Sequence, residues 1–324
     1  MQPLPTPDGI IAAAQAVREV VQPMPLLENP VLNRRLGGRL LLKTEIMHTS
    51  GAFKIRGAYT WLKRNLLSAP RPVIACSSGN HGLAVAQLAQ RFGLDATIVT
   101  PADAPKVKKQ GIEDAGATLI VYDRARENRE RIAQQRAQAT GGVVIHPFDD
   151  VDVIEGQGTV GDEIMNEARA AGYTIDQIAV PCGGGGLTAG IATMFIGHST
   201  QVIPVEVPDF DGMARSLKAG ILTAAPGGRS SICDGVLPLT PSALTLVSCQ
   251  AADVQHTVLI DEVAVRAAVR TIFTYFHLAV EPSGAMGLAA VLAGKIDPCN
   301  KTTVVVCTGG NVDPALFGSI INGN

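Results

Sequence analysis

The stretch IAVPCGGGGL, residues 178–187, decides the fold. Its first five residues form an apolar, partly β-branched run that is typical of a buried strand, and a helical pattern begins at Leu187. The four glycines between them let backbone N–H groups approach an anion closely, at the positive end of a helix dipole. We therefore predict a strand–loop–helix unit whose loop binds a phosphate. The alternative is a tight turn without a ligand, but such a turn needs fewer glycines.

Strands and helices alternate regularly along the chain, which indicates parallel βαβ units. We expect residues 72–148 to form a small mobile lobe, and residues 1–71 and 149–324 to form a large lobe. The expected strands lie at residues 40–43, 73–76, 96–100, 118–122, 143–145, 178–182, 202–207 and 303–307. The expected helices lie at residues 8–21, from 54 through 66, 82–92, 105–114, 124–139, 158–171, from 187, 261–276 and 283–292.

Composition and charge exclude several classes of protein. Hydrophobic residues make up 46% of the 324 residues and charged residues 17%, which suits a compact α/β enzyme. The net charge of −2 provides no basic surface for nucleic acid or anionic lipid. The N-terminus lacks the pattern of a secretion signal, and no run of about 18 apolar residues predicts a membrane span. We expect a cytoplasmic protein with a small-molecule ligand and reduced cysteines.

A lysine in the stretch SGAFKIRGA, residues 50–58, is the candidate reactive group. Phe53 and Ile55 flank Lys54 and glycines lie nearby, so its ammonium is expected to be partly desolvated. Desolvation disfavours the charged form, and a lysine closer to neutral can attack a carbonyl carbon. The alternative is a lysine at a helix start, with its stem along the core and its head in water.

Two further small-residue motifs follow apolar runs: SSGNHG at residues 77–82 and TGGN at residues 308–311. Open α/β sheets bind ligands at loops that follow the carboxyl ends of their strands. We therefore expect these two loops to lie beside the lysine and the glycine loop. The glycine loop at residues 183–186 has neither the GxGxxG nor the GxxxxGK[ST] pattern, which argues against a dinucleotide or a nucleoside triphosphate as its ligand.

In this order the four motifs resemble those of the fold-type II pyridoxal-phosphate (PLP) enzymes, in particular the threonine/serine dehydratase and serine racemase family. The resemblance runs from about Pro25 to Pro314. It implies an α/β fold like that of the tryptophan synthase β chain, with two lobes that each hold an open, mostly parallel sheet flanked by helices. It also implies PLP as the cofactor, an amino acid as the substrate and a homodimer as the assembly.

The resemblance implies roles for individual residues. Lys54 forms the Schiff base with PLP, Asn80 bonds the phenolic oxygen, and the hydroxyl of Thr308 faces the pyridine nitrogen. The residues expected to bind the cofactor are Phe53, Lys54, Asn80, Gly183, Gly184, Gly185, Gly186, Leu187, Glu281 and Thr308. The residues expected to bind the substrate carboxylate are Ser77, Ser78, Gly79, Asn80 and His81. Three structural alternatives stay open: Ser77 or Ser78 as a helix cap, Thr308 as a strand end, and Glu281 as a helix-start cap.

By this resemblance the chain is an ammonia-forming dehydratase. Lys54 removes the α-proton of a β-hydroxy-α-amino acid, and the products are a 2-oxo acid and ammonia. Substrates of the threonine, serine, 3-hydroxyaspartate or phenylserine type suit this reaction. A racemase is the first alternative, because racemases of the family use a serine at the Ser78 position as a second acid–base group. A non-catalytic ligand-binding module is the other alternative, and it would not need Lys54.

A cation site is the last expectation from the resemblance. Family members that bind a divalent ion use a glutamate after a strand, a carbonyl four positions later and an aspartate six positions later. Glu206 and the carbonyl of Phe210 match this pattern, but Gly212 stands in place of the aspartate. The remaining oxygen ligands favour a monovalent ion, or none, over a divalent one. The alternative is that Glu206 caps a helix.

Overall fold

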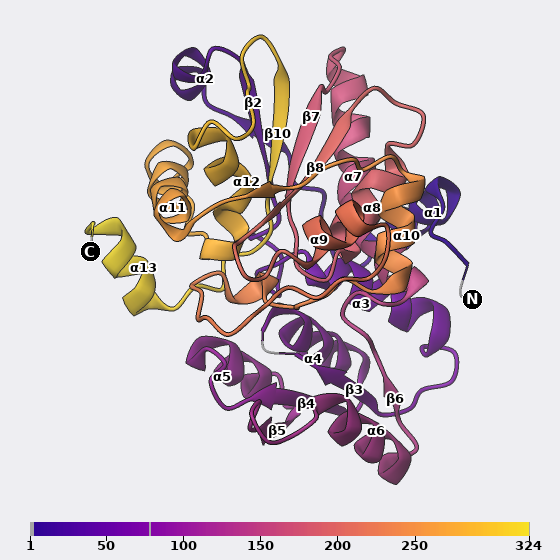
Figure 1. Cartoon of the computed structure of the whole chain (residues 1–324). Helices are drawn as coiled ribbons and strands as arrows, with labels where there is room; N and C mark the ends of the chain where they lie inside the picture. Colours follow the sequence, from indigo (N-terminus) through magenta and orange to yellow (C-terminus); the bar gives the residue numbers. More distant parts are fainter. Residues whose placement is uncertain (1–2, 78, 324) are drawn as a thin grey trace.

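Two sheets form the framework of the molecule, and Figure 1 shows the larger one above the smaller. The computed structural model describes residues 3–77 and 79–323. The strands of the larger sheet are β1 (Leu26–Glu28), β2 (Arg39–Thr44), β7 (Gln177–Pro181), β8 (Gln201–Glu206), β9 (Val258–Leu259) and β10 (Thr302–Cys307). Those of the smaller sheet are β3 (Val73–Cys76), β4 (Ala96–Pro101), β5 (Thr118–Tyr122) and β6 (Val143–Val144).

The larger sheet is parallel apart from one edge. Its strand order is β1-β2-β10-β7-β8-β9, and only β1 pairs antiparallel to its neighbour among the described strands. In the centre, Val304 of β10 lies opposite Leu41 on one side and Ile178 on the other. These central strands are apolar along almost their whole length because helices cover both faces of the sheet.

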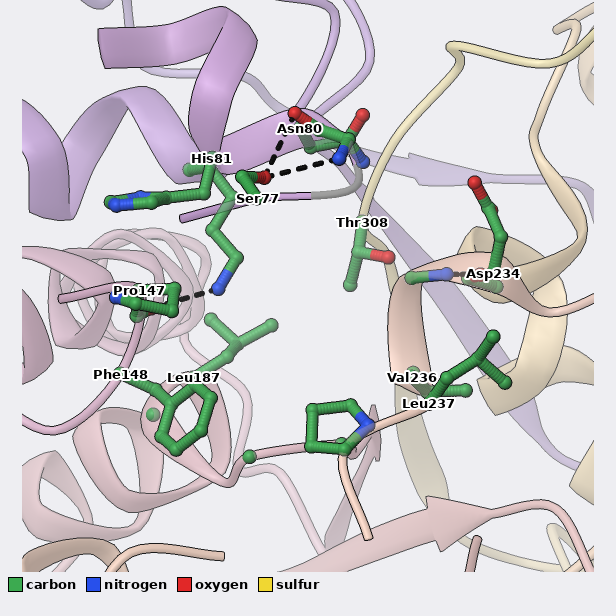
Figure 2. A pocket seen from close by; sticks show the side chains of 18 of the residues that line it. Ser77, Asn80, His81, Pro147, Phe148, Leu187, Asp234, Val236, Leu237 and Thr308 are labelled. Carbon is green, nitrogen blue, oxygen red and sulfur yellow. Dashed lines mark hydrogen bonds between the residues drawn. The ribbon is translucent and has the colours of Figure 1, made fainter. Parts of the chain in front are cut away.

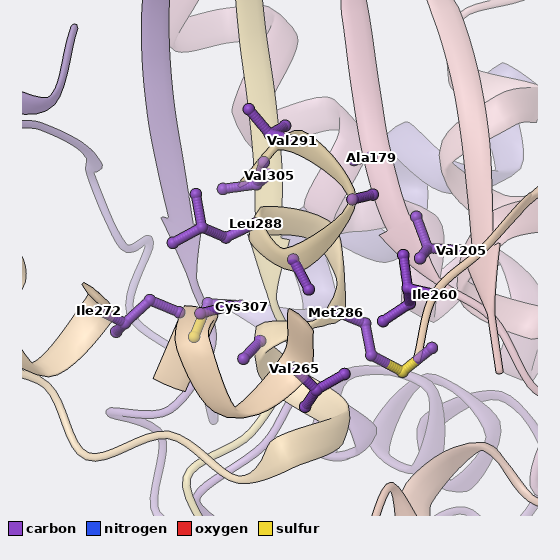
Figure 3. Packing of buried hydrophobic residues seen from close by; sticks show 14 of the residues in the cluster. Ala179, Val205, Ile260, Val265, Ile272, Met286, Leu288, Val291, Val305 and Cys307 are labelled. Atoms are coloured by element: carbon purple, nitrogen blue, oxygen red, sulfur yellow. The ribbon is translucent and has the colours of Figure 1, made fainter. Parts of the chain in front are cut away.

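Helices pack on both faces of the larger sheet (Figure 1). Figure 3 shows one face, where Met286 and Leu288 of α12 pack with Val305 in a fully buried cluster. On the other face, α1, α7 and α8 pack on the strands through residues such as Ile10 and Ile191. Burying one such side chain stabilises the fold by about 1.5–3 kcal/mol. The helices associated with the larger sheet are α1 (Pro7–Val17), α2 (Pro30–Leu36), α3 (Lys54–Asn65), α7 (Val151–Ala171), α8 (Gly186–Met194), α9 (Gly212–Ala219), η1 (Asp234–Val236), α10 (Ala243–Ala251), α11 (Glu262–Phe276), α12 (Pro282–Leu292) and α13 (Pro314–Ile321).

The smaller sheet has the strand order β5-β4-β3-β6, and all its described neighbours are parallel. Three helices accompany it: α4 (Asn80–Phe92), α5 (Lys106–Asp114) and α6 (Arg129–Thr140). Side chains of α3, α4 and α5 cover one face, and α6 covers the other through Ala133. The predicted fold class, an α/β protein with two mostly parallel sheets, is confirmed. The lobe boundaries and the mobility of the small lobe stay predictions.

Several helix starts differ from the prediction, and in α1, α6 and α7 a side-chain cap at another position is the reason. Helix α1 starts at Pro7 rather than at Asp8, since the Thr6 hydroxyl accepts the Gly9 N–H at 3.0 Å. It ends at Val17 rather than at residue 21, and Ile11 is exposed. Helix α6 starts five residues late, after an Asn128 cap, and α7 starts seven residues early, after an Asp150 cap.

Glycines inside α7 explain why its first two turns escaped the sequence prediction. A methyl group on Gly156 would lie 2.6 Å from Cα of Gly57 in α3. One on Gly158 would lie 2.9 Å from the carbonyl oxygen of Gly190 in α8. Each glycine weakens an isolated helix by about 1 kcal/mol, so glycines at these positions predict that the helix is interrupted. Here the glycines instead allow three helices to approach closely.

The remaining whole-chain expectations concern cysteines and membranes. All six cysteines lie in the described part of the chain and none is in a disulfide; only Cys299 is exposed. Across residues 3–77 and 79–323, every helix is too short or too polar to cross a membrane.

Candidate active site

A cavity of about 280 Å³ lies where β3, β7 and β10 reach their carboxyl ends. Figure 2 shows side chains from loops and helices beside both sheets pointing into it. The predicted site residues that line it are Phe53, Lys54, Ser77, Gly79, Asn80, His81, Gly183, Gly184, Gly185, Gly186, Leu187, Glu281 and Thr308. Ser78 lies outside the described residues. The structure therefore brings all four sequence motifs to one place.

Lys54 is the first residue of α3, and its ammonium group reaches the cavity. Nζ donates a hydrogen bond to the carbonyl oxygen of Pro147 at 2.9 Å (Figure 2). Burial lowers the pKa of Lys54 to about 8, with no contribution from a negatively charged partner among the described residues. A substantial neutral fraction at physiological pH makes this amine a nucleophile and a base.

The glycine loop also lines the cavity and leads into α8. Gly185 has φ of 87°, which glycine adopts without strain, and no side chain caps the first turn of the helix. A methyl group on Gly184 would lie 2.3 Å from the ring of Phe148. The loop thus leaves uncapped N–H groups of a helix N-terminus facing the cavity, a ready anion site.

A chain of charged and polar groups crosses the cavity wall. Asn80 donates to Glu281 at 2.6 Å, and Glu281 lies 3.0 Å from Nζ of Lys108. Lys108 also pairs with Asp234 at 2.7 Å. Burial raises the pKa of Glu281 although Lys108 opposes the shift, and the two carboxylates raise the pKa of Lys108 against the effect of its own burial. Glu281 makes no capping bond to α12, so its side chain serves this network instead.

Three other predicted residues take defined positions. The hydroxyl of Thr308 points into the cavity from the end of β10 (Figure 2). The hydroxyl of Ser77 bonds the backbone of Gly79, while the cap position of α4 belongs to Gly79 itself and has no side-chain partner. His81 shares a hydrogen bond with the carbonyl of Ile145, and burial lowers its pKa to about 3. A neutral His81 therefore contributes no charge to the site.

Glu206 lies away from the cavity and caps α9. Its two carboxylate oxygens accept the N–H groups of Met213 and Ala214, each at 2.8 Å. Burial raises the pKa of Glu206 to about 7 despite these bonds. Within the described residues, no group of three or more His, Cys, Asp or Glu side chains is arranged to hold a metal ion. The cation site at Glu206 and Phe210 stays a prediction, and the capping role is the one its contacts support.

Sequence reasoning missed several residues of the cavity wall. Lys108 and Asp234 come from segments without a small-residue motif, and Phe148 follows a short edge strand. Arg124 and Arg129 reach the wall from the region that was expected to be one continuous helix. The run HPFDD at residues 146–150, with a proline shortly after a strand, was the signal that could have pointed to a special loop.

Comparison with known proteins identifies the family. The family model described as "Pyridoxal-phosphate dependent enzyme" matches residues 17–309, most of the chain. The chain belongs to this family. The L-threonine ammonia-lyase of Thermotoga maritima is 34% identical over 98% of this chain and 78% of its own length. The serine racemase of Bos taurus is also 34% identical, over 92% of this chain and 90% of its own.

Solved structures of pyridoxal-phosphate dependent enzymes share the fold. A threonine deaminase, from the organism abbreviated T.th., superposes with a TM-score of 0.87 and 37% identity, covering 95% of this chain and 99% of that protein. The resemblance inferred from the sequence motifs is therefore confirmed, and so is PLP as the cofactor implied by the family. Roles of individual residues stay predictions.

The cavity fits PLP on structural grounds. A lysine with a lowered pKa offers an amine for the aldehyde, and an uncapped helix N-terminus offers N–H groups for the phosphate. Methyl groups on Gly183 and Gly184 would fill the space between the loop and its neighbours Val236 and Phe148. The residues present are thus those that a phosphorylated aldehyde requires.

Proposed function

We propose that this protein is a PLP-dependent dehydratase that converts a β-hydroxy-α-amino acid to a 2-oxo acid and ammonia. The observation that carries the proposal is the amine of Lys54, whose pKa is lowered to about 8, in one cavity with the glycine loop. The family relationship supports a dehydratase or a racemase, and the L-threonine ammonia-lyase of Thermotoga maritima is among the relatives. The proposal adds the substrate class to that coarser conclusion.

Each wall of the cavity has a part in the proposed reaction. Lys54 would hold the cofactor covalently, and N–H groups of the glycine loop would hold its phosphate. When bound, PLP withdraws electrons from the substrate α-carbon. The released Lys54 amine would then take the α-proton, which its lowered pKa favours. Asn80, oriented by Glu281, would donate a hydrogen bond to the phenolic oxygen of the cofactor.

Charge in the cavity supports an amino acid with an acidic group as one candidate substrate. Arg124 and Arg129 line the wall. Burial alone would lower the pKa of Arg129, but the neighbouring carboxylate of Glu130 outweighs this effect and raises the pKa of Arg129. A guanidinium group attracts carboxylates. In this structure Arg124 pairs with Asp103 at 2.8 Å and Arg129 with Glu130 at 2.7 Å. Among the proposed substrates, 3-hydroxyaspartate has a second carboxylate that these arginines could pair with, whereas threonine, serine and phenylserine have one.

Racemisation is the second candidate function. The specific observations in its favour are the 34% identity to the serine racemase of Bos taurus and the presence of Ser78 in the SSGNHG motif. A racemase needs an acid–base group on each side of the α-carbon, and we propose that Ser78 would be the partner of Lys54. The two reactions differ in their products, because racemisation releases no ammonia.

A substrate panel tests both candidates in one experiment. L-Threonine, L-serine, 3-hydroxyaspartate and phenylserine, with their stereoisomers, are incubated with the PLP-loaded protein. Oxo acid, ammonia and loss of optical activity are measured together. The proposal expects oxo acid and ammonia in equal amounts from at least one substrate, and neither from Lys54→Ala. Loss of optical activity without ammonia, abolished by Ser78→Ala, would instead establish the racemase.

A further inference from the structure

His146 makes an unusual pair of hydrogen bonds just after β6. Its Nδ1 atom accepts the backbone N–H of Asp149 at 2.7 Å and that of Phe148 at 3.3 Å. Its ring also contacts the ring of Phe148 edge to face, with centroids 4.8 Å apart. One imidazole nitrogen thereby fixes the backbone of residues 147–149, which we call the crossover segment.

The crossover segment contacts both halves of the candidate cofactor site. The carbonyl of Pro147 accepts the hydrogen bond from the Lys54 ammonium at 2.9 Å (Figure 2). The next residue, Phe148, packs against the glycine loop so closely that a methyl group on Gly184 would overlap its ring. Any shift of this segment would therefore move the acceptor of Lys54 and the support of the phosphate loop together.

The bonding pattern requires a neutral imidazole. Two N–H donors converge on Nδ1, so this nitrogen carries a lone pair and the proton resides on Nε2. Protonation would place a hydrogen on Nδ1 that points at the same two donors, and both bonds would be lost. His146 is half-buried, and its side chain does not line the cavity, so it acts through the segment alone.

The charges around His146 have opposite signs. Burial lowers its pKa, with Arg129 and the Lys54 ammonium acting in the same direction. Asp149 and Glu130 oppose them. The neighbouring His81 is neutral at ordinary pH because burial lowers its pKa to about 3. The neutral form of His146 is thus the stable one near pH 7, and acid is needed to charge it.

We propose that His146 is a positioning residue whose neutral form holds the crossover segment, and that its protonation loosens the grip of the protein on PLP. This inference rests on the proposed roles of Lys54 and the glycine loop. On this proposal, the loss of PLP affinity at low pH is caused by protonation of a residue outside the cavity.

The test measures PLP affinity of the apoprotein between about pH 5.5 and about pH 8. Three proteins are compared: wild type, His146→Asn and His146→Leu. Asparagine can present an acceptor oxygen near the position of Nδ1 but does not titrate, and leucine provides no acceptor. His198→Asn is the matched control, because His198 is exposed and also meets a phenylalanine ring edge to face, outside the cavity.

The expected result is a difference between pH profiles. Protonation of Lys54 and of the PLP phosphate affects all variants alike, so the ratio of wild-type to His146→Asn affinity isolates His146. That ratio should fall about tenfold per pH unit below the pKa of His146. His146→Leu should bind PLP weakly at every pH, and His198→Asn should follow the wild type. Parallel profiles for wild type and His146→Asn would overturn the inference.

A second measurement does not depend on any variant. Long-range ¹H–¹⁵N spectra of histidine-labelled apoprotein report which nitrogen of His146 carries the proton. We expect the Nε2–H form at neutral pH, and an Nδ1–H form would overturn the inference. Borohydride reduction of PLP-loaded wild type separates this result from the proposed function. A label absent from Lys54 refutes the function, whereas a label at Lys54 with parallel profiles refutes only the role of His146.

Discussion

Lys108 and Asp234 form an ion pair with a nitrogen–oxygen distance of 2.7 Å across 126 positions of the chain. Lys108 belongs to α5 beside the smaller sheet, and Asp234 begins η1 beside the larger one. The same ammonium lies 3.0 Å from Glu281, the first residue before α12. One buried cation thus joins the two sides of the cavity.

Lys108→Met should destabilise the protein strongly. The substitution leaves the buried carboxyl of Glu281 without its cation, and breaking a buried pair in this way costs about 3–5 kcal/mol. Thermal unfolding measures the loss. Arg126→Met is the control, since Arg126 pairs with Asp123 at the exposed surface, where ion pairs contribute little. Equal melting temperatures for the two variants would contradict the structural role of Lys108.

Gly184→Ala should weaken PLP binding while leaving the fold in place. Its methyl group would lie 2.3 Å from the Phe148 ring, so the loop or the ring must move. We expect at least about a tenfold loss of affinity, equal to roughly 1.4 kcal/mol. Gly318→Ala in α13 is the control: its methyl group meets open space, and alanine should stabilise that helix slightly. Unchanged affinity in Gly184→Ala would exclude the glycine loop as the phosphate site.

The reactivity of Lys54 should follow a pKa of about 8. Burial lowers this pKa from the ordinary value of 10.5, so the neutral amine predominates at a lower pH than in an exposed lysine. Covalent capture of PLP by the apoprotein, trapped with borohydride, should rise with pH and level off above about pH 8. Exposed Lys301 supplies the internal comparison in the same labelled sample. A capture rate that still rises steeply near the pKa of ordinary lysines would contradict the burial of Lys54.

Glu206 should make the protein less stable as pH rises toward neutrality. Its folded pKa is raised to about 7 from an ordinary 4.5, so its contribution is complete below about pH 4.5 and is lost through about pH 7. The shift corresponds to about 3 kcal/mol. Denaturant unfolding of Glu206→Gln, which does not titrate, should lack this component. A bound cation would hold the pKa down, so loss of the effect on adding K⁺ or Mg²⁺ would favour the cation site.

The sequence predicts most of this fold because its strands are short, apolar and separated by clear turns. Strand β5 was predicted with its observed ends, and α12 was predicted within one residue. One error lies where tertiary contacts override local preference. Gly156 and Gly158 suggest a broken helix in isolation, but neighbouring helices approach them so closely that no larger residue fits.

Residues of the candidate site could be predicted where they lie in a sequence motif. They could not be predicted where only the tertiary fold brings them to the cavity. Asn80 and the glycine loop lie in motifs, and the cavity contains them all. Lys108 has no local signal, since its position depends on how α5 packs against a loop more than a hundred residues away. His146 precedes a proline, but the bonds it accepts from the N–H groups of Phe148 and Asp149 depend on a side-chain rotation that sequence does not specify.

The close approach of α3 and α7 also fixes the position of Lys54, the first residue of α3. Gly57 is one turn beyond Lys54 on α3, and Gly156 faces it with no side chain between the two backbones. A helix displaced by even one methyl group would carry the reactive nitrogen with it. The position of the Lys54 amine is therefore set in part by the absence of side chains at Gly57 and Gly156, two residues outside the cavity.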